Sequence, residues 1–108
     1  GKEISGGMKN VKTIDPQEVQ SRLEAGEQLN IIDVREADEV AGGKIPEALH
    51  IPLGLVEFRM NELDKNKEYF VVCHAGGRSA RAVQFLESYG YDVTNINGGM
   101  LAWEGETE

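Results

Sequence analysis

The chain turns from strand to helix within Tyr69-Phe70-Val71-Val72-Cys73-His74-Ala75-Gly76-Gly77-Arg78-Ser79, and its architecture follows from that turn. The β-branched and aromatic run 69–73 is typical of a buried strand, and the paired glycines end it. Helical periodicity follows, so Cys73 is expected at the carboxyl end of a strand, facing the amino terminus of a helix. Open α/β sheets place ligand sites in that crevice. A helix start favours an anion, and the thiolate is the reactive form of cysteine.

Cys73 is the only cysteine, so a structural role has to be weighed against a chemical one. Free cysteine often packs as a small buried hydrophobe. A core cysteine needs neither the glycine pair nor an arginine five positions on, which favours a functional thiol. The glycines allow a loop whose N–H groups point inward and hold negative charge. Ser79 could cap the following helix, and Arg78 could either line the loop or brace it from outside.

The remaining chain alternates short apolar runs with helical patterns. Asp15, Pro16 and Glu18 predict a helix start with a capping box. Ala82, Phe85, Leu86 and Tyr89 predict one apolar stripe on the helix after the loop. Strands are expected over 11–14, 29–34, 48–51, 69–73 and 92–96, and helices or helical turns over 15–25, 36–40, 56–63, 79–89 and 100–103. This order predicts an α/β domain of three layers, a mostly parallel five-stranded sheet with helices on both faces.

Length and charge narrow the class of protein. With 108 residues the chain is expected to form one domain over 10–108, while residues 1–9 lack periodicity and are expected to be a flexible end or a cloning remnant. The formal charge of −8, from 19 acidic and 11 basic side chains, argues against nucleic acid and anionic lipid as partners. Attraction of a small anion would have to be local, near Arg78 and Arg81.

The sequence predicts a monomeric cytoplasmic protein without cofactor or metal. It has no apolar run long enough to span a membrane and no secretion signal. One cysteine forbids an intrachain disulfide, which suits a reducing compartment. One cysteine and two histidines at unhelpful spacing make no convincing metal site.

Four stretches taken in order resemble a known family. They are Asp33-Val34-Arg35 after a strand, Gly43-Lys44-Ile45-Pro46-Glu47-Ala48, the loop 73–79, and Gly98-Gly99 followed by Trp103. Over about 13–103 the chain resembles the single-domain rhodanese-like proteins. Lys44 stands where that family often has histidine, and Glu47 where it often has glycine. We expect Lys44 to be a solvated loop cation without a catalytic role, and His50 to be a strand residue with its ring satisfied locally.

The resemblance implies sulfurtransferase chemistry. Cys73, as thiolate, would take the outer sulfur of a donor such as thiosulfate, and the resulting persulfide would pass it to cyanide or a thiol, including a thiol of an acceptor protein. The loop residues His74, Ala75, Gly76, Gly77, Arg78 and Ser79 would bind the substrate. Asp33 and Arg35 would brace the loops by hydrogen bonds, and the His74 side chain would point outward.

Two other functions compete with sulfur transfer. Cysteine phosphatases use a similar loop but need five residues between cysteine and arginine, because a tetrahedral oxyanion is larger than a sulfur. Here only residues 74–77 intervene, which favours sulfur. A non-catalytic binding module of the same fold is the second alternative, because fold alone does not confer function.

Overall fold

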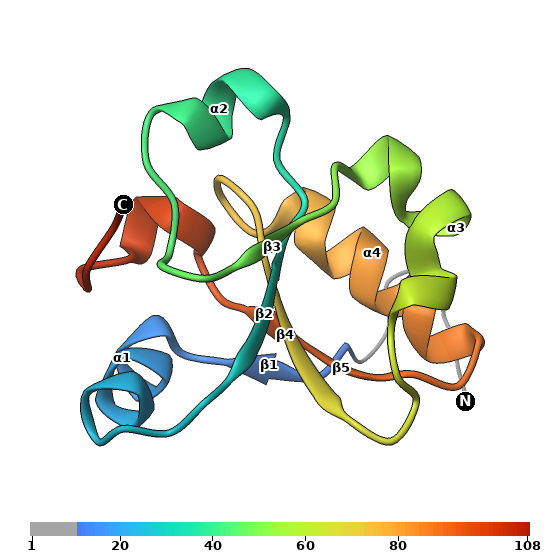
Figure 1. Ribbon diagram of the computed structural model, residues 1–108, viewed down its shortest axis with the longest axis horizontal. Coiled ribbons are helices and arrows are strands. Elements are labelled where there is room, and N and C mark those ends of the chain that lie inside the picture. The colour runs from blue at the N-terminus through green and yellow to red at the C-terminus, as the bar shows by residue number, and fades with distance from the viewer. Residues whose placement is uncertain (1–10) are drawn as a thin grey trace.

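Residues 11–108, which a computed structural model describes, are built around a parallel five-stranded sheet (Figure 1). The strand order is β1-β5-β4-β2-β3, and each neighbouring pair of these strands runs parallel. The strands are β1 (Thr13–Ile14), β2 (Asn30–Asp33), β3 (Leu49–His50), β4 (Glu68–Val72) and β5 (Asp92–Ile96). The carboxyl ends of parallel strands meet at one edge, so the turn that follows β4 lies beside the ends of β2 and β5.

Helices cover both faces of the sheet, which confirms the three-layer α/β prediction (Figure 1). One face packs against α1 (Pro16–Glu24) and the short 3-10 helix η3 (Gly99–Ala102). The other packs against α4 (Gly77–Ser88) and the chain from η1 (Leu53–Leu55) through α3 (Val56–Arg59) to η2 (Met60–Glu62). The remaining helix, α2 (Ala37–Ala41), follows the carboxyl end of β2.

Strand alternation divides the core into two clusters and decides where the cysteine points. Along β4, Phe70 and Val72 join the cluster beneath α1, while Tyr69 and Val71 join the cluster beneath α3 and α4. Successive side chains of a strand point to opposite faces, so Cys73 continues the second set. It belongs to the cluster with Ala82, Val83 and Leu86 of α4. The thiol therefore lies between the sheet and the start of α4.

Three expectations about the elements need correction. The helix expected over 56–63 is a single turn of α-helix, α3, followed by the 3-10 turn η2, and the 3-10 turn η1 precedes it. Tyr89 of the expected core stripe is 49% exposed and only covers Phe85, with ring centroids 4.9 Å apart. The strands expected over 11–14, 29–34 and 48–51 are shorter at their ends.

The helix starts also differ from the prediction. Asp15 has the extended backbone of an N-cap for α1, but its side chain makes no capping hydrogen bond and instead accepts one from Asn97 Nδ2 at 3.3 Å. The capping box occurs at α2, where the Glu36 N–H donates to Glu39 Oε1 at 2.8 Å. The flexible end expected over residues 1–9 lies outside the described residues.

Candidate active site

Cys73 lies directly after β4, in the turn that leads to α4, as the sequence predicts. Its Sγ accepts a hydrogen bond from the Gly76 N–H at 3.0 Å and contacts Ser79 Oγ at 3.2 Å. Gly76 has a φ of +109°, a left-handed conformation that suits glycine, and a Cβ there would lie 3.4 Å from the Gly98 nitrogen. The glycine therefore lets the loop turn one of its N–H groups toward the sulfur.

The thiol is buried but surrounded by hydrogen-bond donors. Only 1% of Cys73 is exposed. Burial is the largest influence and raises the pKa of the thiol, because a thiolate loses its hydration. The Ser79 hydroxyl and the N–H groups of Ser79, Gly76 and Ala75 act against it. Together these donors lower the pKa of Cys73 below its ordinary value, so the loop favours a negative sulfur.

Ser79 does not cap α4, contrary to one expectation. The N-cap residue is Gly76, without a side-chain capping bond, and Ser79 lies inside the first turn. Its fully buried hydroxyl instead lies between Cys73 Sγ and the side chain of Asn95 on β5, with the Gly76 carbonyl at 3.2 Å. Ser79 thus joins the sulfur to the neighbouring strand.

Arg78 braces the loop from outside. Its two terminal nitrogens donate to the two carboxylate oxygens of Glu39 at 2.7 and 2.8 Å, a bidentate pair between α4 and α2. The Arg78 guanidinium lowers the pKa of Glu39 to about 2. Glu39 in turn raises the pKa of Arg78, to which the Cys73 charge also contributes. Arg81 lies exposed on α4.

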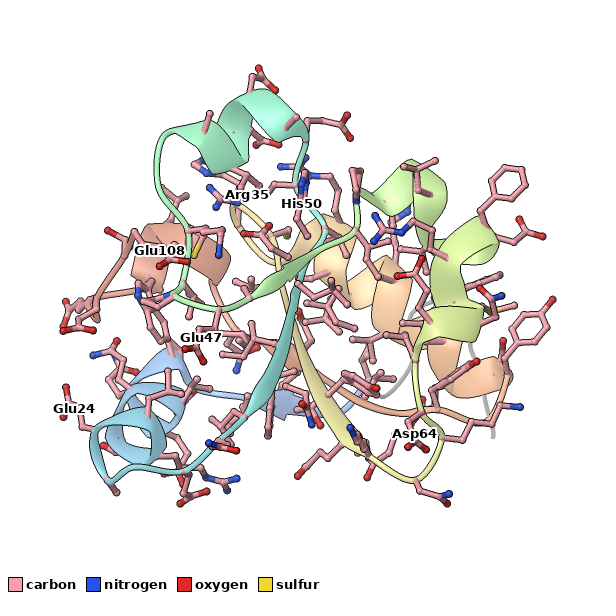
Figure 2. The ribbon with its side chains drawn as sticks, viewed as in Figure 1. Glu24, Arg35, Glu47, His50, Asp64 and Glu108 are labelled. Atoms are coloured by element: carbon pink, nitrogen blue, oxygen red, sulfur yellow. The ribbon has the colours of Figure 1, made fainter. Side chains whose placement is uncertain are left out.

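Asp33 and Arg35 form a buried pair after β2 that fastens α2 to the sheet. Arg35 Nη2 donates to Asp33 Oδ2 at 2.8 Å, and Asp33 is fully buried. The same guanidinium donates to the carbonyls of Gly43 at 2.7 Å and Glu39 at 3.3 Å. Both side chains therefore brace loops by hydrogen bonds, as expected. Figure 2 shows Arg35 and His50 close together near the ends of their strands, and His50 Nε2 lies 2.7 Å from the Arg35 carbonyl.

The glycine pair before Trp103 supports the loop from its other side. The N–H groups of Met100 and Leu101 donate to the carbonyls of Cys73 and His74 at 2.8 and 2.9 Å. Gly99 has a φ of +58°, and a Cβ there would lie 2.4 Å from the Cys73 oxygen. No side chain fits at that distance, so glycine is required for η3 to dock. The sequence predicted this motif only by resemblance, and the contact supplies its physical reason.

Lys44 and Glu47, the two residues that depart from the pattern of the family that the chain resembles, lie in one segment, residues 43–48. Lys44 is not a solvated cation, contrary to expectation: its Nζ lies 2.8 Å from Glu108 Oε2 and within 3.5 Å of the Ile45 and Ala48 carbonyls. The Glu47 N–H donates to the same Glu108 oxygen at 3.2 Å. Figure 2 shows Glu47 and Glu108 near each other at the left of the view. These contacts of Lys44 and Glu47 are separate from the hydrogen bonds of the Cys73 loop.

Two residues of the site were missed by sequence reasoning, Glu39 and Asn95. The sequence places Glu39 only in a helical turn and Asn95 only in a strand. An asparagine between apolar Val93 and Ile96, in a strand predicted to be buried, is the local signal that could have indicated a buried polar role. His74 and Ala75 are exposed, as expected for the rim of the loop.

Comparison with known proteins identifies the family. Residues 15–106 match the family model described as the rhodanese-like domain. The chain is 45% identical over 98 residues to a candidate sulfurtransferase of Bacillus subtilis (strain 168), covering 91% of this chain and 95% of that protein. It is 31% identical over 97 residues to the thiosulfate sulfurtransferase of Pseudomonas syringae pv. syringae (strain B728a), covering 89% and 90%.

A solved structure agrees with these matches. The crystal structure of a rhodanese-like domain protein from Staphylococcus aureus aligns with a TM-score of 0.85 at 40% identity, covering 90% of this chain and 96% of that one. The chain therefore belongs to the rhodanese-like domain family, and its relatives support a place among the family's sulfurtransferases. Within residues 11–108, no helix combines the length and apolar character needed to cross a bilayer.

Proposed function

We propose that the protein transfers a sulfane sulfur through a persulfide on Cys73. The observation that carries this proposal is the hydrogen bonding of the sulfur. Sγ accepts from the Gly76 N–H and contacts the Ser79 hydroxyl, in a loop whose donors lower the pKa of the thiol. A thiolate at neutral pH is the nucleophile that sulfur transfer requires.

The reaction proceeds in two nucleophilic steps. The Cys73 thiolate attacks the outer sulfur of thiosulfate, a Sγ–S bond forms, and the donor's S–S bond breaks as sulfite leaves with the bonding electrons. The enzyme then carries a persulfide whose negative charge lies on the outer sulfur. Cyanide attacks that sulfur and leaves as thiocyanate, or a thiolate takes it and becomes a persulfide, and in each case the Cys73 thiolate returns. Inward N–H groups favour the anionic states, as an oxyanion hole favours its oxygen.

Burial of the thiol limits the donor. Because 1% of Cys73 is exposed, a donor has to present a terminal sulfur, which thiosulfate and organic persulfides both do. The loop residues His74 to Ser79 form the binding site in this proposal, with Asp33 and Arg35 in support. The Pseudomonas syringae relative, which matches over 90% of its own length, is named a thiosulfate sulfurtransferase, and this favours thiosulfate as one such donor.

The position of Arg78 argues against phosphate as the substrate. A phosphatase loop directs its arginine to the bound oxyanion, whereas both terminal nitrogens of Arg78 are engaged by Glu39. Only four residues separate Cys73 from Arg78. The acceptor is a small thiophile or a protein thiol, in a cytoplasmic protein that acts as a monomer without cofactor, metal, nucleic acid or membrane.

Intact mass spectrometry after incubation with thiosulfate tests the proposal. We expect the wild type to gain the mass of one sulfur atom and to lose it again on addition of cyanide. Cys73→Ala should gain nothing, and Cys73→Ser provides a matched control that keeps a polar side chain of similar size. A folded wild type that gains no sulfur from thiosulfate or from an organic persulfide would favour the non-catalytic binding module.

A further inference from the structure

Ser79 offers one hydroxyl hydrogen to three acceptors. Its Oγ lies 3.2 Å from Cys73 Sγ, 3.2 Å from the Gly76 carbonyl, and in a short hydrogen bond with Asn95 Oδ1. A serine hydroxyl has a single hydrogen, so it can donate fully to only one of them at a time. Ser79 is completely buried and Asn95 is 6% exposed, so bulk water does not supply the missing donors.

The orientation of the Asn95 amide follows from its neighbours. Its Nδ2 donates to the Gly76 carbonyl at 3.4 Å, and a carbonyl can only accept. Turning the amide over would set two acceptors, Oδ1 and the Gly76 oxygen, against each other. Oδ1 therefore faces Ser79, and since an amide oxygen cannot donate, the hydroxyl hydrogen has to point at Asn95 for that bond to form.

Strand register places Asn95 on the face that carries the thiol. Asn95 pairs with Val71 of β4, two residues before Cys73. Val71, Cys73 and Val93 all belong to the core cluster beneath α4, and Asn95 follows Val93 by two positions, so it points to the same side. Thr94 points to the opposite side. The Asn95 amide is thus presented to Ser79 from beneath the loop.

We propose that Asn95 is a positioning residue that holds the Ser79 hydroxyl hydrogen whenever Cys73 Sγ carries no charge. In the thiol, S–H donates to Ser79 Oγ and the Ser79 hydroxyl donates to Asn95. On ionisation the thiol proton leaves to solvent, and the hydroxyl hydrogen turns to the negative sulfur. In the persulfide, Sγ is neutral again and the Ser79 hydroxyl hydrogen returns to Asn95. This last step alone rests on the proposed function.

The competition has a defined consequence for the thiol. Asn95 stabilises the states with an uncharged Sγ and so holds the thiol's ionisation at a higher pH than Ser79 alone would set. The charged or titratable groups next to Cys73 along the chain and on neighbouring elements include His74 of the loop, Arg78 of α4, which is paired with Glu39 of α2, and Asp33, which is paired with Arg35 and lies opposite Val72. None of them contacts the Asn95 amide through a hydrogen bond described for residues 11–108, so substitution of Asn95 leaves these charges in place.

The pH profile of Cys73 alkylation by iodoacetamide tests this proposal in the full chain. Asn95→Val and Asn95→Ala both remove the amide oxygen but leave different side-chain volumes. We expect both to move the midpoint to lower pH and to raise the rate below the midpoint by up to about fivefold, the effect of one hydrogen bond. Lower thiolate basicity reduces intrinsic nucleophilicity, so the midpoint is the primary measurement. Thr94→Val on the same strand is the matched control and should leave it unchanged.

A double-variant comparison separates positioning from packing. Ser79→Ala should move the midpoint to higher pH, and in that background Asn95→Val should have no further effect. An unchanged midpoint in Ser79→Ala overturns the proposal even if the Asn95 variants fail to fold. A midpoint that is unchanged or raised in the Asn95 variants also overturns it. So does an Asn95→Val substitution that lowers the midpoint equally with and without Ser79→Ala. Alkylation needs no sulfur donor, so this result is independent of whether the wild type takes up sulfur from thiosulfate.

Discussion

The bidentate pair between Arg78 and Glu39 joins two elements that are not adjacent in the chain. Arg78 lies in the first turn of α4, where the loop that carries Cys73 ends, and Glu39 lies in α2. Both side chains are about one-third exposed, at 32% and 30%, so water partly screens the attraction. For a pair of this exposure the net stabilisation is modest, about 1 kcal/mol at most.

Glu39→Gln is expected to make the domain's stability less dependent on acid. The pKa of Glu39 in the folded chain is about 2, below the ordinary 4.5, so its stabilising contribution is fully present above about pH 4.5. It is lost as pH falls from there through about 2. Glutamine can still serve the α2 capping box, which isolates the charge. Urea unfolding should show the wild type more stable by about 1 kcal/mol at pH 6, with the difference vanishing toward pH 2.

Arg78→Ala provides the control for that measurement. If the pair is responsible, Glu39→Gln has little further effect in the Arg78→Ala background. A difference between wild type and Glu39→Gln that stays constant from pH 6 to pH 2 would contradict this account, because a protonated Glu39 cannot form the ion pair.

Glu47→Gly is expected to stabilise the domain. Glu47 has a φ of +67°, a left-handed conformation that costs a residue with a Cβ about 1–2 kcal/mol. Glycine avoids this cost but gains freedom in the unfolded chain worth about 0.4–1 kcal/mol, so the net gain in the free energy of unfolding is between about 0 and 1.6 kcal/mol. Thermal unfolding should show a Tm higher by a few degrees. Glu47→Ala, which keeps the Cβ, should show no such rise, and a Glu47→Gly Tm at or below that of Glu47→Ala would argue against strain here.

At the scale of elements, the loop is held between two segments that come from either side of it in the chain. α2 contacts it through Glu39, and η3 donates to the Cys73 and His74 carbonyls. Arg35 fastens α2 to the sheet through Asp33. The conformation that directs the Gly76 N–H to the sulfur therefore depends on tertiary contacts as well as on local glycines.

Sequence reasoning succeeded where a pattern is local. Asp92 to Ile96 reads as a strand and forms one, and the turn from β4 to α4 follows from apolar residues ended by glycines. It failed where a side chain's partner is far away in the chain. Lys44 meets Glu108, and Ser79 faces Asn95 rather than capping its own helix. The change from α3 to η2 within 56–63 was not predicted either, because apolar spacing indicates a buried face but not whether the helix continues.

The charge of the whole molecule should govern how fast anions reach the thiol. The net charge is −8, and the arginine nearest the loop is already paired with Glu39. We expect iodoacetate, an anion, to alkylate Cys73 more slowly than neutral iodoacetamide at low salt. The rate with iodoacetate divided by the rate with iodoacetamide should rise as salt is added. Salt screens repulsion beyond about 10 Å at 0.1 M.

The two reagents differ in charge and little in size, so iodoacetamide is the internal control. Urea-unfolded protein provides a second control, in which the salt dependence of the ratio should be weaker. A ratio that falls as salt is added would mean that local positive charge at the loop, from Arg78 or Arg81, outweighs the acidic surface.

The docking of η3 on the loop bears on biosynthesis. The carbonyls of Cys73 and His74 find their donors in Met100 and Leu101, more than twenty residues later, and β5 with Asn95 also comes after the loop. A nascent chain still attached to the ribosome, with those residues in the exit tunnel, would carry an ordinary cysteine. The surroundings of Cys73 are therefore complete only after β5 and η3 have been made and have docked on the loop.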